Sequence, residues 1–204
     1  MRKKLLIISC TLLIAVVWII RFYSVNGRFK AYRDNVEEII YNMNEYVELG
    51  DNLTYGGFIH KGYSVLVKKA RVLEADDFLK EIGKLPNDFN IEIADKYIEV
   101  TLDIINSGNN EEGLLFYSFQ ISGIDWYTFF NHEETAFSND FMNDNIEQSY
   151  GVIVNKNSSA EVKIIYPLYT WMLPTSRWEQ IKKEKLFFCI TRNPIEQKVL
   201  LEFD

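Results

Sequence analysis

Few residues in this sequence are suited to acid–base, nucleophilic or metal chemistry. Only two histidines occur, His60 and His132. His132 begins the run His-Glu-Glu, whereas the helical zinc motif of metalloproteases needs a second histidine four residues after the first. Cys189 lies in the apolar run 186–190, which predicts a buried strand cysteine rather than a nucleophile, because a reactive thiol needs an accessible, electropositive setting. The sequence therefore predicts no catalytic residue, no metal ligand and no cofactor.

Carboxylate and amide side chains are concentrated between Asn139 and Glu147. Calcium prefers six to eight oxygen ligands, and an EF-hand loop needs an oxygen ligand at its third position and a glutamate at its twelfth. Counted from Asp140, these positions hold Met142 and Gly151. We therefore interpret the stretch as a solvated loop or helix cap, with an irregular calcium site as the alternative.

Aromatic residues make up 15% of the chain, more than a β-sandwich core of this size needs. They gather in residues 114–119 and 126–130, with others between positions 166 and 178. Core packing accounts for most of them, and the remainder predicts an exposed aromatic face of the kind that protein interfaces favour. The residues expected to form this interaction surface are Trp126, Tyr127, Tyr169 and Trp171.

The elements that must position these side chains are mainly β-strands. Apolar and polar residues alternate in short runs, which Gly, Asn, Ser and Pro turn signals separate. One short helix is expected at Ala75–Ile82, with Gly83 ending it. This pattern, without alternating long helices, predicts an antiparallel β-sandwich. Strands are expected at 63–73, 97–105, 113–121, 124–130, 150–154, 160–166, 185–191 and 198–203.

Residues 28–46 have a different periodicity. Apolar side chains from Phe29 to Tyr46 recur at steps of three and four, with charged residues between them, which predicts an amphipathic helix. We interpret it as a juxtamembrane stalk or a self-association surface. A first helix packed on the domain is the alternative, because two heptads are too few to specify a coiled coil.

Residues 1–27 have the features of a membrane-targeting segment. Three basic residues precede an apolar run of 16 residues, Leu5–Ile20, which Arg21 closes. A helix of this length covers about 24 Å, and flanking aromatic and basic side chains extend it toward the roughly 30 Å of a bilayer core. This predicts an uncleaved signal anchor that crosses the membrane once. Cleavage near Val25–Gly27, which would release a secreted body, is the alternative.

Charge divides the 204-residue chain into a basic head and an acidic body. The formal net charge is −7, and residues 28–204 alone carry −11 because the head holds four basic residues and no acidic one. An acidic body disfavours nucleic-acid binding, which needs clustered Lys and Arg. Positive charges on the two sides of the apolar run nearly cancel, so the orientation rests on the head's similarity to an export signal, which places the body outside the cytoplasm.

Several short segments of the body carry a resemblance to a known family. They are Val47–Asp51, Gly62–Val65, Val100–Leu102 leading to Asn106–Gly108, Trp126 after Gly123–Asp125, Tyr166–Leu168 and Asn193–Pro194. Residues 46–204 thus resemble the small immunoglobulin-like extracytoplasmic domains of unknown function that follow a signal or membrane anchor in Gram-positive bacteria. The resemblance implies a secreted or membrane-tethered sandwich without an assigned enzymatic role, and it carries over no catalytic residue.

Three parts and one function are expected from these patterns. The parts are a signal anchor at 1–27, a juxtamembrane amphipathic helix at 28–46 and an immunoglobulin-like β-sandwich at 47–204. The function is a membrane-tethered extracytoplasmic binding or interaction module without catalytic activity, whose partner is a cell-surface protein or cell-wall component. The alternatives are an extracellular hydrolase built on two carboxylates, whose spacing is spatial and not visible in sequence, and a small membrane-anchored protective protein that acts as immunity proteins do.

Overall fold

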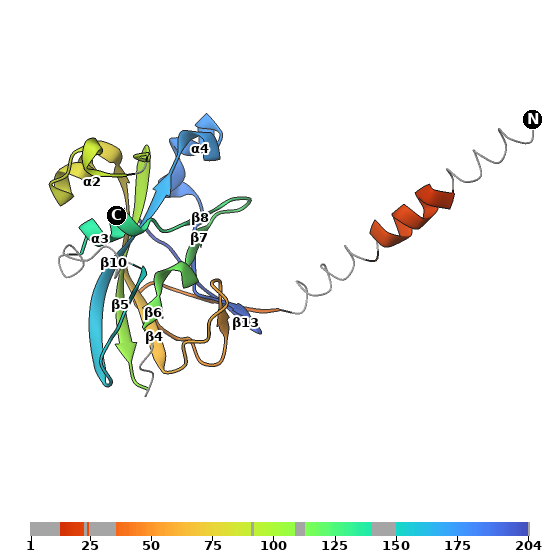
Figure 1. Ribbon diagram of the computed structural model, residues 1–204, viewed down its shortest axis with the longest axis horizontal. Coiled ribbons are helices and arrows are strands. Elements are labelled where there is room, and N and C mark those ends of the chain that lie inside the picture. Colours follow the sequence, from red (N-terminus) through yellow and green to blue (C-terminus); the bar gives the residue numbers. More distant parts are fainter. Residues whose placement is uncertain are drawn as a thin grey trace, which may run out of the picture. The chain divides into compact units, whose positions relative to one another are not determined.

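The computed structural model describes residues 13–22, 24, 36–90, 92–108, 113–139 and 150–203 (Figure 1). The chain divides into two units, residues 1–37 and 38–204. In the first unit, residues 13–22 and 24 are helical. None of the helices in the described part of the chain has the length and apolarity needed to cross a membrane. Most of the expected anchor at 1–27 lies outside the described residues.

The second unit is mainly β. Its strands are β1 (Glu37–Tyr41), β2 (Tyr46–Glu48), β3 (Leu53–Thr54), β4 (Tyr63–Glu74), β5 (Lys96–Asn106), β6 (Leu114–Leu115), β7 (Gln120–Ser122), β8 (Tyr127–Phe129), β9 (Gly151–Val152), β10 (Ser158–Leu168), β11 (Phe187–Cys189), β12 (Thr191–Asn193) and β13 (Ile195–Leu200). The helices are α2 (Ala75–Ile82), α3 (His132–Phe137) and α4 (Thr175–Trp178), with 3-10 turns η1 (Pro86–Asp88), η2 (Phe116–Ser118), η5 (Thr170–Met172) and η6 (Ile181–Lys183).

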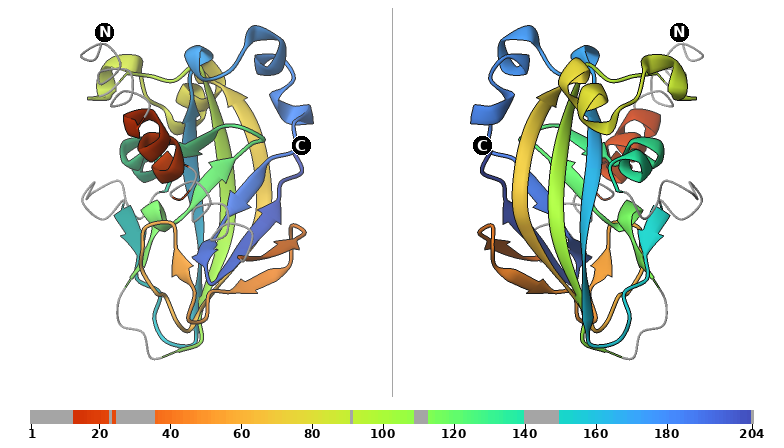
Figure 2. Two further views of the ribbon diagram at one scale, coloured as in Figure 1. Left: turned by 90° about the vertical axis from the view of Figure 1, so that its right-hand side faces the viewer. Right: turned by 90° about the vertical axis from the view of Figure 1, so that its left-hand side faces the viewer.

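Two antiparallel sheets form the body of the domain. One has the strand order β10-β5-β4-β2 and the other β1-β13-β11-β7-β8, and two short pairs, β12-β3 and β6-β9, complete the set. The long strands β4, β5 and β10 stay paired from the level of Asn106 to that of Lys96, with one irregularity between Val67 and Lys69. Figure 2 shows these three strands curving across one side of the domain, with β7, β11 and β13 on the opposite side.

The main core lies between the two sheets. Alternate residues of β4, β5 and β10 point into it because successive side chains of a strand face opposite ways, and they meet residues of β7, β11 and β13. Tyr166 of β10 and Phe188 of β11 contact each other edge to face across this core, with ring centroids 6.3 Å apart. A second, smaller core covers the outer face of the four-stranded sheet, where Phe78 of α2 packs on Tyr97 of β5 at 4.3 Å.

Helix α3 and the residues around it cover the outer edge of β10. The side-chain amide of Asn139 donates to the Lys163 carbonyl at 2.8 Å, and its oxygen accepts from the Lys163 N–H at 2.9 Å. The hydroxyl of Thr135 accepts from the Ile165 N–H at 3.1 Å. Pro167 lies two residues after Ile165 and faces the same outer edge of β10. Its missing N–H therefore costs the sheet no hydrogen bond between strands. The covered edge cannot pair with another chain over these residues.

We expect Asn139→Ala to destabilise the domain by about 1–3 kcal/mol, because it leaves the Lys163 N–H and C=O without partners at a covered edge. Urea unfolding of the purified full chain measures the effect. Asn139→Asp is the matched variant: it keeps the oxygen that accepts from Lys163 but places a buried carboxylate against the Thr135 and Lys163 carbonyls, so its loss should be at least as large. Equal stability of all three proteins would contradict this account of the β10 edge.

The expected helix at 28–46 is wrong where the structure describes it. Residues 37–41 form β1 and residues 46–48 form β2. Ile39 and Tyr41 are partly buried and Ile40 between them is exposed, which is the period of a strand. Asn44 adopts a left-handed φ of 66°, and its N–H donates to the Val67 carbonyl at 2.9 Å. Pairing with distant strands therefore outweighs the local helical periodicity; residues 28–35 lie outside the described part.

Candidate functional site

Trp171 is the most exposed tryptophan of the described domain, with 79% of its surface accessible. Its ring stacks on Tyr169, with centroids 5.6 Å apart and planes 14° from parallel. Both residues belong to the segment that leaves β10 and enters η5, at the end of the domain that also carries α2 and α4 (Figure 1). Two of the four residues expected to form an interaction surface are thus brought together as one stacked pair, in which Trp171 is exposed and Tyr169 is partly buried against the second core.

Hydrogen bonds to the segment before β5 hold this pair in place. Asp95 accepts from the Thr170 N–H at 2.8 Å through Oδ2, and the Asp95 N–H donates to the Leu168 carbonyl at 3.1 Å. The hydroxyl of Tyr169 donates to the Glu92 carbonyl at 3.4 Å. Because these contacts fix the backbone on both sides of Tyr169, the exposed Trp171 ring is presented by a tethered turn.

A buried carboxyl group belongs to the same part of the domain. Glu134 of α3 is fully buried, and neither of its carboxylate oxygens has a hydrogen-bond partner. Burial raises the pKa of Glu134 to about 8; the nearby Tyr97 hydroxyl partly opposes this shift and the charge of Glu133 adds to it. The Glu134 side chain is therefore mostly a neutral acid at pH 7, which is the form that an apolar surrounding tolerates.

Carboxyl groups surround the phenol of Tyr169. Its pKa is raised by burial first, and then by electrostatic interaction with Glu134, Glu92 and Asp95. Glu92 and Asp95 are exposed, whereas Glu134 is buried. Because Glu134 is mostly protonated at pH 7, the negative charge near the aromatic pair comes from the two exposed residues, Glu92 and Asp95.

Trp126 and Tyr127, the other two residues expected at the interaction surface, lie elsewhere in the domain. Trp126 is only 9% exposed, and its indole N–H donates to Glu184 at 2.9 Å, so its inclusion in an exposed surface is wrong. Arg177 also binds Glu184, and a bond to Asp125 at 2.6 Å ties it to the β7–β8 turn. Tyr127 is 60% exposed and packs edge to face on Phe129, 5.4 Å away, along strand β8.

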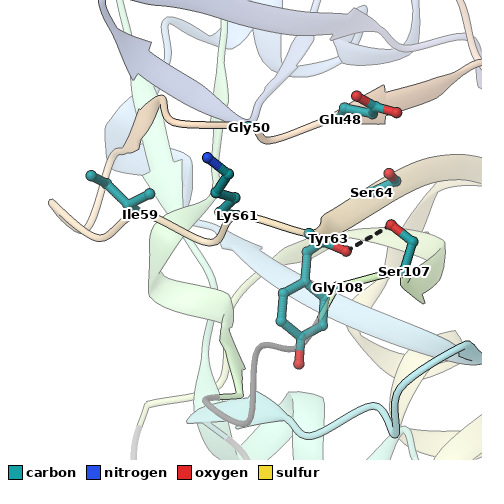
Figure 3. Close-up of a pocket in the computed structure, with 9 residues that line it drawn as sticks. Glu48, Gly50, Ile59, Lys61, Tyr63, Ser64, Ser107 and Gly108 are labelled. Carbon is teal, nitrogen blue, oxygen red and sulfur yellow. Dashed lines mark hydrogen bonds between the residues drawn. The ribbon is translucent and has the colours of Figure 1, made fainter.

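A pocket at the ends of β2, β4 and β5 was not expected from the sequence. Its volume is about 590 Å³. Figure 3 shows Glu48, Gly50 and Lys61 along one side of it, with Ser107 and Gly108 across from them. The Ser107 hydroxyl donates to the Gly62 carbonyl at 3.2 Å, and Lys61 forms an exposed ion pair with Asp51 at 3.1 Å. The lining combines polar groups of Lys61, Ser64 and Ser107 with apolar surface of Ile59 and Tyr63, and its one carboxylate is that of Glu48.

Close approach of two glycines shapes this pocket. A Cβ on Gly62 would lie 2.8 Å from the Gly108 Cα, and Gly62 has a φ of 87°. A side chain at position 62 would therefore meet both a backbone clash and an unfavourable conformation. No sequence signal identified the pocket, because its residues come from segments that are separate along the chain and meet only through strand pairing.

The residues considered for nucleophilic or metal chemistry are dispersed. His60 is buried, with Nε2 3.2 Å from the Ser118 hydroxyl, and His132 stacks on Tyr150 at 5.2 Å. No three His, Cys, Asp or Glu side chains among the described residues are grouped as metal ligands. The acidic loop expected at 139–147 falls, after Asn139, on residues that the structure does not describe.

Cys189 lies in β11 and is fully buried, which confirms the interpretation as a buried strand cysteine. Its sulfur is 3.0 Å from the Ser122 hydroxyl oxygen. Burial raises the pKa of the thiol, and the neutral form is the less nucleophilic one. The local chemistry is thus that of a packing residue.

These features define a mainly β domain of two antiparallel sheets with a stacked aromatic pair at one end. Residues 38–197 match the family described as a domain of unknown function, DUF5028, and the chain belongs to that family. No curated protein and no solved structure matches the chain. The match begins next to the division between the two units at residue 38.

Proposed function

We propose that this protein is a non-catalytic binding module, tethered by its apolar head to the membrane, with the β domain outside the cytoplasm. The observation that supports the proposal most is the exposed Trp171 ring stacked on Tyr169. Interfaces concentrate their binding energy in tryptophan and tyrosine, which bury a large area at a small cost in side-chain entropy. A single exposed apolar residue is common on protein surfaces. A stacked pair whose conformation is fixed by hydrogen bonds is instead preorganised for binding a partner.

We include in this proposal that the β domain is an immunoglobulin-like sandwich. An immunoglobulin-like sandwich behind a signal anchor suits a surface-binding role, and the antiparallel two-sheet architecture is compatible with it. The partner class is a cell-surface protein or a cell-wall component. The hydrolase alternative needs two carboxylates in a cleft, and the described pocket lining contains Glu48 alone, so it has less support.

Site-specific photo-crosslinking in intact cells tests the binding proposal. We expect a benzophenone amino acid at position 171 of the full chain to form a discrete adduct with one partner. The same group at Ile153, which is equally exposed but lies outside the aromatic pair, should form none. Identical adduct patterns at both positions, or none at either, would contradict a dedicated contact surface at Trp171.

Location is tested separately by protease treatment of intact cells. We expect the β domain to be degraded while cytoplasmic proteins survive, because the proposed orientation exposes it to the medium. Protection of the domain until the cells are lysed would show that the outside orientation is wrong, without bearing on the contact made by Trp171.

A further inference from the structure

We propose that the surface formed by Trp171, Tyr169, Glu92 and Asp95, here termed the Trp171 surface, binds an arginine or lysine side chain of a basic peptide segment in a partner protein. This inference rests on the proposed binding function and names the chemistry of its partner. The geometry that points to it is a planar aromatic stack with two exposed acidic residues hydrogen-bonded to the same turn.

The aromatic part supplies an attractive face for a cation. The ring of tryptophan has the strongest quadrupole among aromatic side chains and attracts an ammonium or guanidinium group placed over its face. Tyr169 covers part of Trp171, yet 79% of the Trp171 surface stays accessible. The hydrogen bonds that fix Tyr169 and Thr170 mean that little ordering remains to be done when a ligand arrives.

The carboxylates supply charge complementarity. Asp95 uses Oδ2 to accept from the Thr170 N–H, and both it and Glu92 are exposed. That hydrogen bond places Asp95 beside the stack, and the Glu92 carbonyl accepts from the Tyr169 hydroxyl at 3.4 Å, so both acidic residues are positioned to favour a positive charge there. A guanidinium group can lie flat on an indole ring while donating to a carboxylate at its edge.

The chain's own cations are used elsewhere in the described domain. Lys96 lies over Trp178 at 5.3 Å and pairs with Glu74, and Lys84 lies over Phe137 at 4.3 Å. None of the cation–π contacts among the described residues involves Trp171. The domain therefore places its own cations on other rings, and the Trp171 ring remains available to a cation from outside.

The charge of the body favours a basic peptide over other partners. Residues 28–204 carry a formal charge of −11, which attracts basic segments over long range and repels phosphate backbones. A neutral glycan could stack on the aromatic face and donate its hydroxyls to Glu92 and Asp95, but it would lack the charge attraction that a cation gains from them. The two features together therefore favour a peptide with arginine or lysine.

Fluorescence anisotropy tests the inference with the full chain in a non-ionic detergent and a labelled peptide of alternating arginine and glycine. We expect Trp171→Ala to weaken binding about tenfold and Trp171→Phe to weaken it less, because a smaller ring keeps part of the attraction. Glu92→Gln and Asp95→Asn should each weaken it about threefold. Glu161→Gln on β10 is the control, because it removes one charge from an exposed ion pair with Lys68 of β4.

A matched peptide with citrulline in place of arginine separates charge from shape. We expect it to lose most of the affinity. Equal affinity of the two peptides, or an effect of Trp171→Ala no larger than that of Glu161→Gln, would overturn the inference. Binding to neutral phosphatidylcholine vesicles through Trp171 instead of to the peptide would overturn it as well.

Failure of this inference and failure of the proposed function give different results. If position 171 forms a specific adduct in cells but the arginine peptide does not bind, the surface is a contact site for a partner of another chemistry. If neither result is obtained, the binding proposal itself fails. Circular dichroism of each variant checks folding, and we expect no change because Trp171 is exposed.

Discussion

Replacing Glu134 with glutamine is expected to make the domain more stable than the parent protein at pH 7–8, by about 2–4 kcal/mol. Glu134 is fully buried without a hydrogen-bond partner on either oxygen, and burial raises its pKa to about 8. An acid of this kind favours the folded state only while it is protonated. Glutamine has nearly the same shape and no charge to lose.

The direction of the pH effect follows from proton linkage. In the unfolded chain Glu134 ionises near its ordinary pKa of 4.5, whereas in the folded domain it keeps its proton until about pH 8. Between these values the folded state binds more protons, so the stability of the parent falls as pH rises, by about 1.4 kcal/mol per pH unit. The contribution is fully present below pH 4.5 and is lost as the pH passes through 8.

Urea unfolding at several pH values between 5 and 9 measures this difference. We expect the free energies of unfolding of parent and Glu134→Gln to diverge as the pH rises to about 8 and to differ by a constant amount above it. Glu133→Gln is the matched control in the same helix, because its carboxylate accepts from the Asn90 backbone N–H at 3.1 Å and from its amide at 2.7 Å. That variant should be less stable than the parent. Parallel pH profiles for parent and Glu134→Gln would contradict the buried neutral acid.

Removing the guanidinium of Arg71 is expected to destabilise the four-stranded sheet strongly. Arg71 donates to both oxygens of Glu99, at 2.7 and 2.9 Å, and to both oxygens of Glu81 in α2, at 3.0 and 2.6 Å. Glu99 lies on β5 and is 4% exposed. The hydrogen bonds to Glu99 raise the pKa of Arg71, although its partial burial opposes the shift.

Arg71→Met should therefore cost about 3–5 kcal/mol, because it leaves the Glu99 carboxylate buried without its partner. The substitution also removes the ion pair that joins β4 to Glu81 of α2, although Phe78 of that helix stays packed on Tyr97. Arg71→Lys keeps the charge but not the two-pronged geometry, and its loss should be intermediate.

Thermal and urea unfolding measure the cost of losing Arg71, and a double variant isolates its cause. In Arg71→Met with Glu99→Gln the buried charge is absent, so we expect part of the lost stability to return. A loss below about 1 kcal/mol for Arg71→Met alone would show that Glu99 is better solvated than its burial indicates.

Local sequence patterns were sufficient for the long regular elements. The strand expected at 63–73 is β4, the helix expected at 75–82 has those bounds, and Gly83 ends it with a φ of 66°. The strands expected at 97–105 and 160–166 are confirmed within β5 and β10. Each of these segments is long enough for its own periodicity to outweigh alternatives.

Short elements depended on pairing that no local window contains. The segment expected as one strand at 113–121 is a two-residue strand, a 3-10 turn and part of β7. The segment at 185–191 is divided between β11 and β12, which pair with different partners. At 28–46 the helical spacing of apolar residues was misleading. In the described part of this segment, β1, β2 and the turn at Asn44 form their backbone hydrogen bonds with distant strands instead of within a helix.

The sequence by itself determined the mainly β class, the acidic body and the set of aromatic residues from which a surface is made. Only the tertiary structure decided that Trp126 is buried against Glu184 while Trp171 is exposed on Tyr169. It also decided that Glu134, near the start of a short helix where an acid is ordinarily solvated, lies in a core. Burial is set by residues distant along the chain, so identical residue types with similar neighbours end in opposite environments.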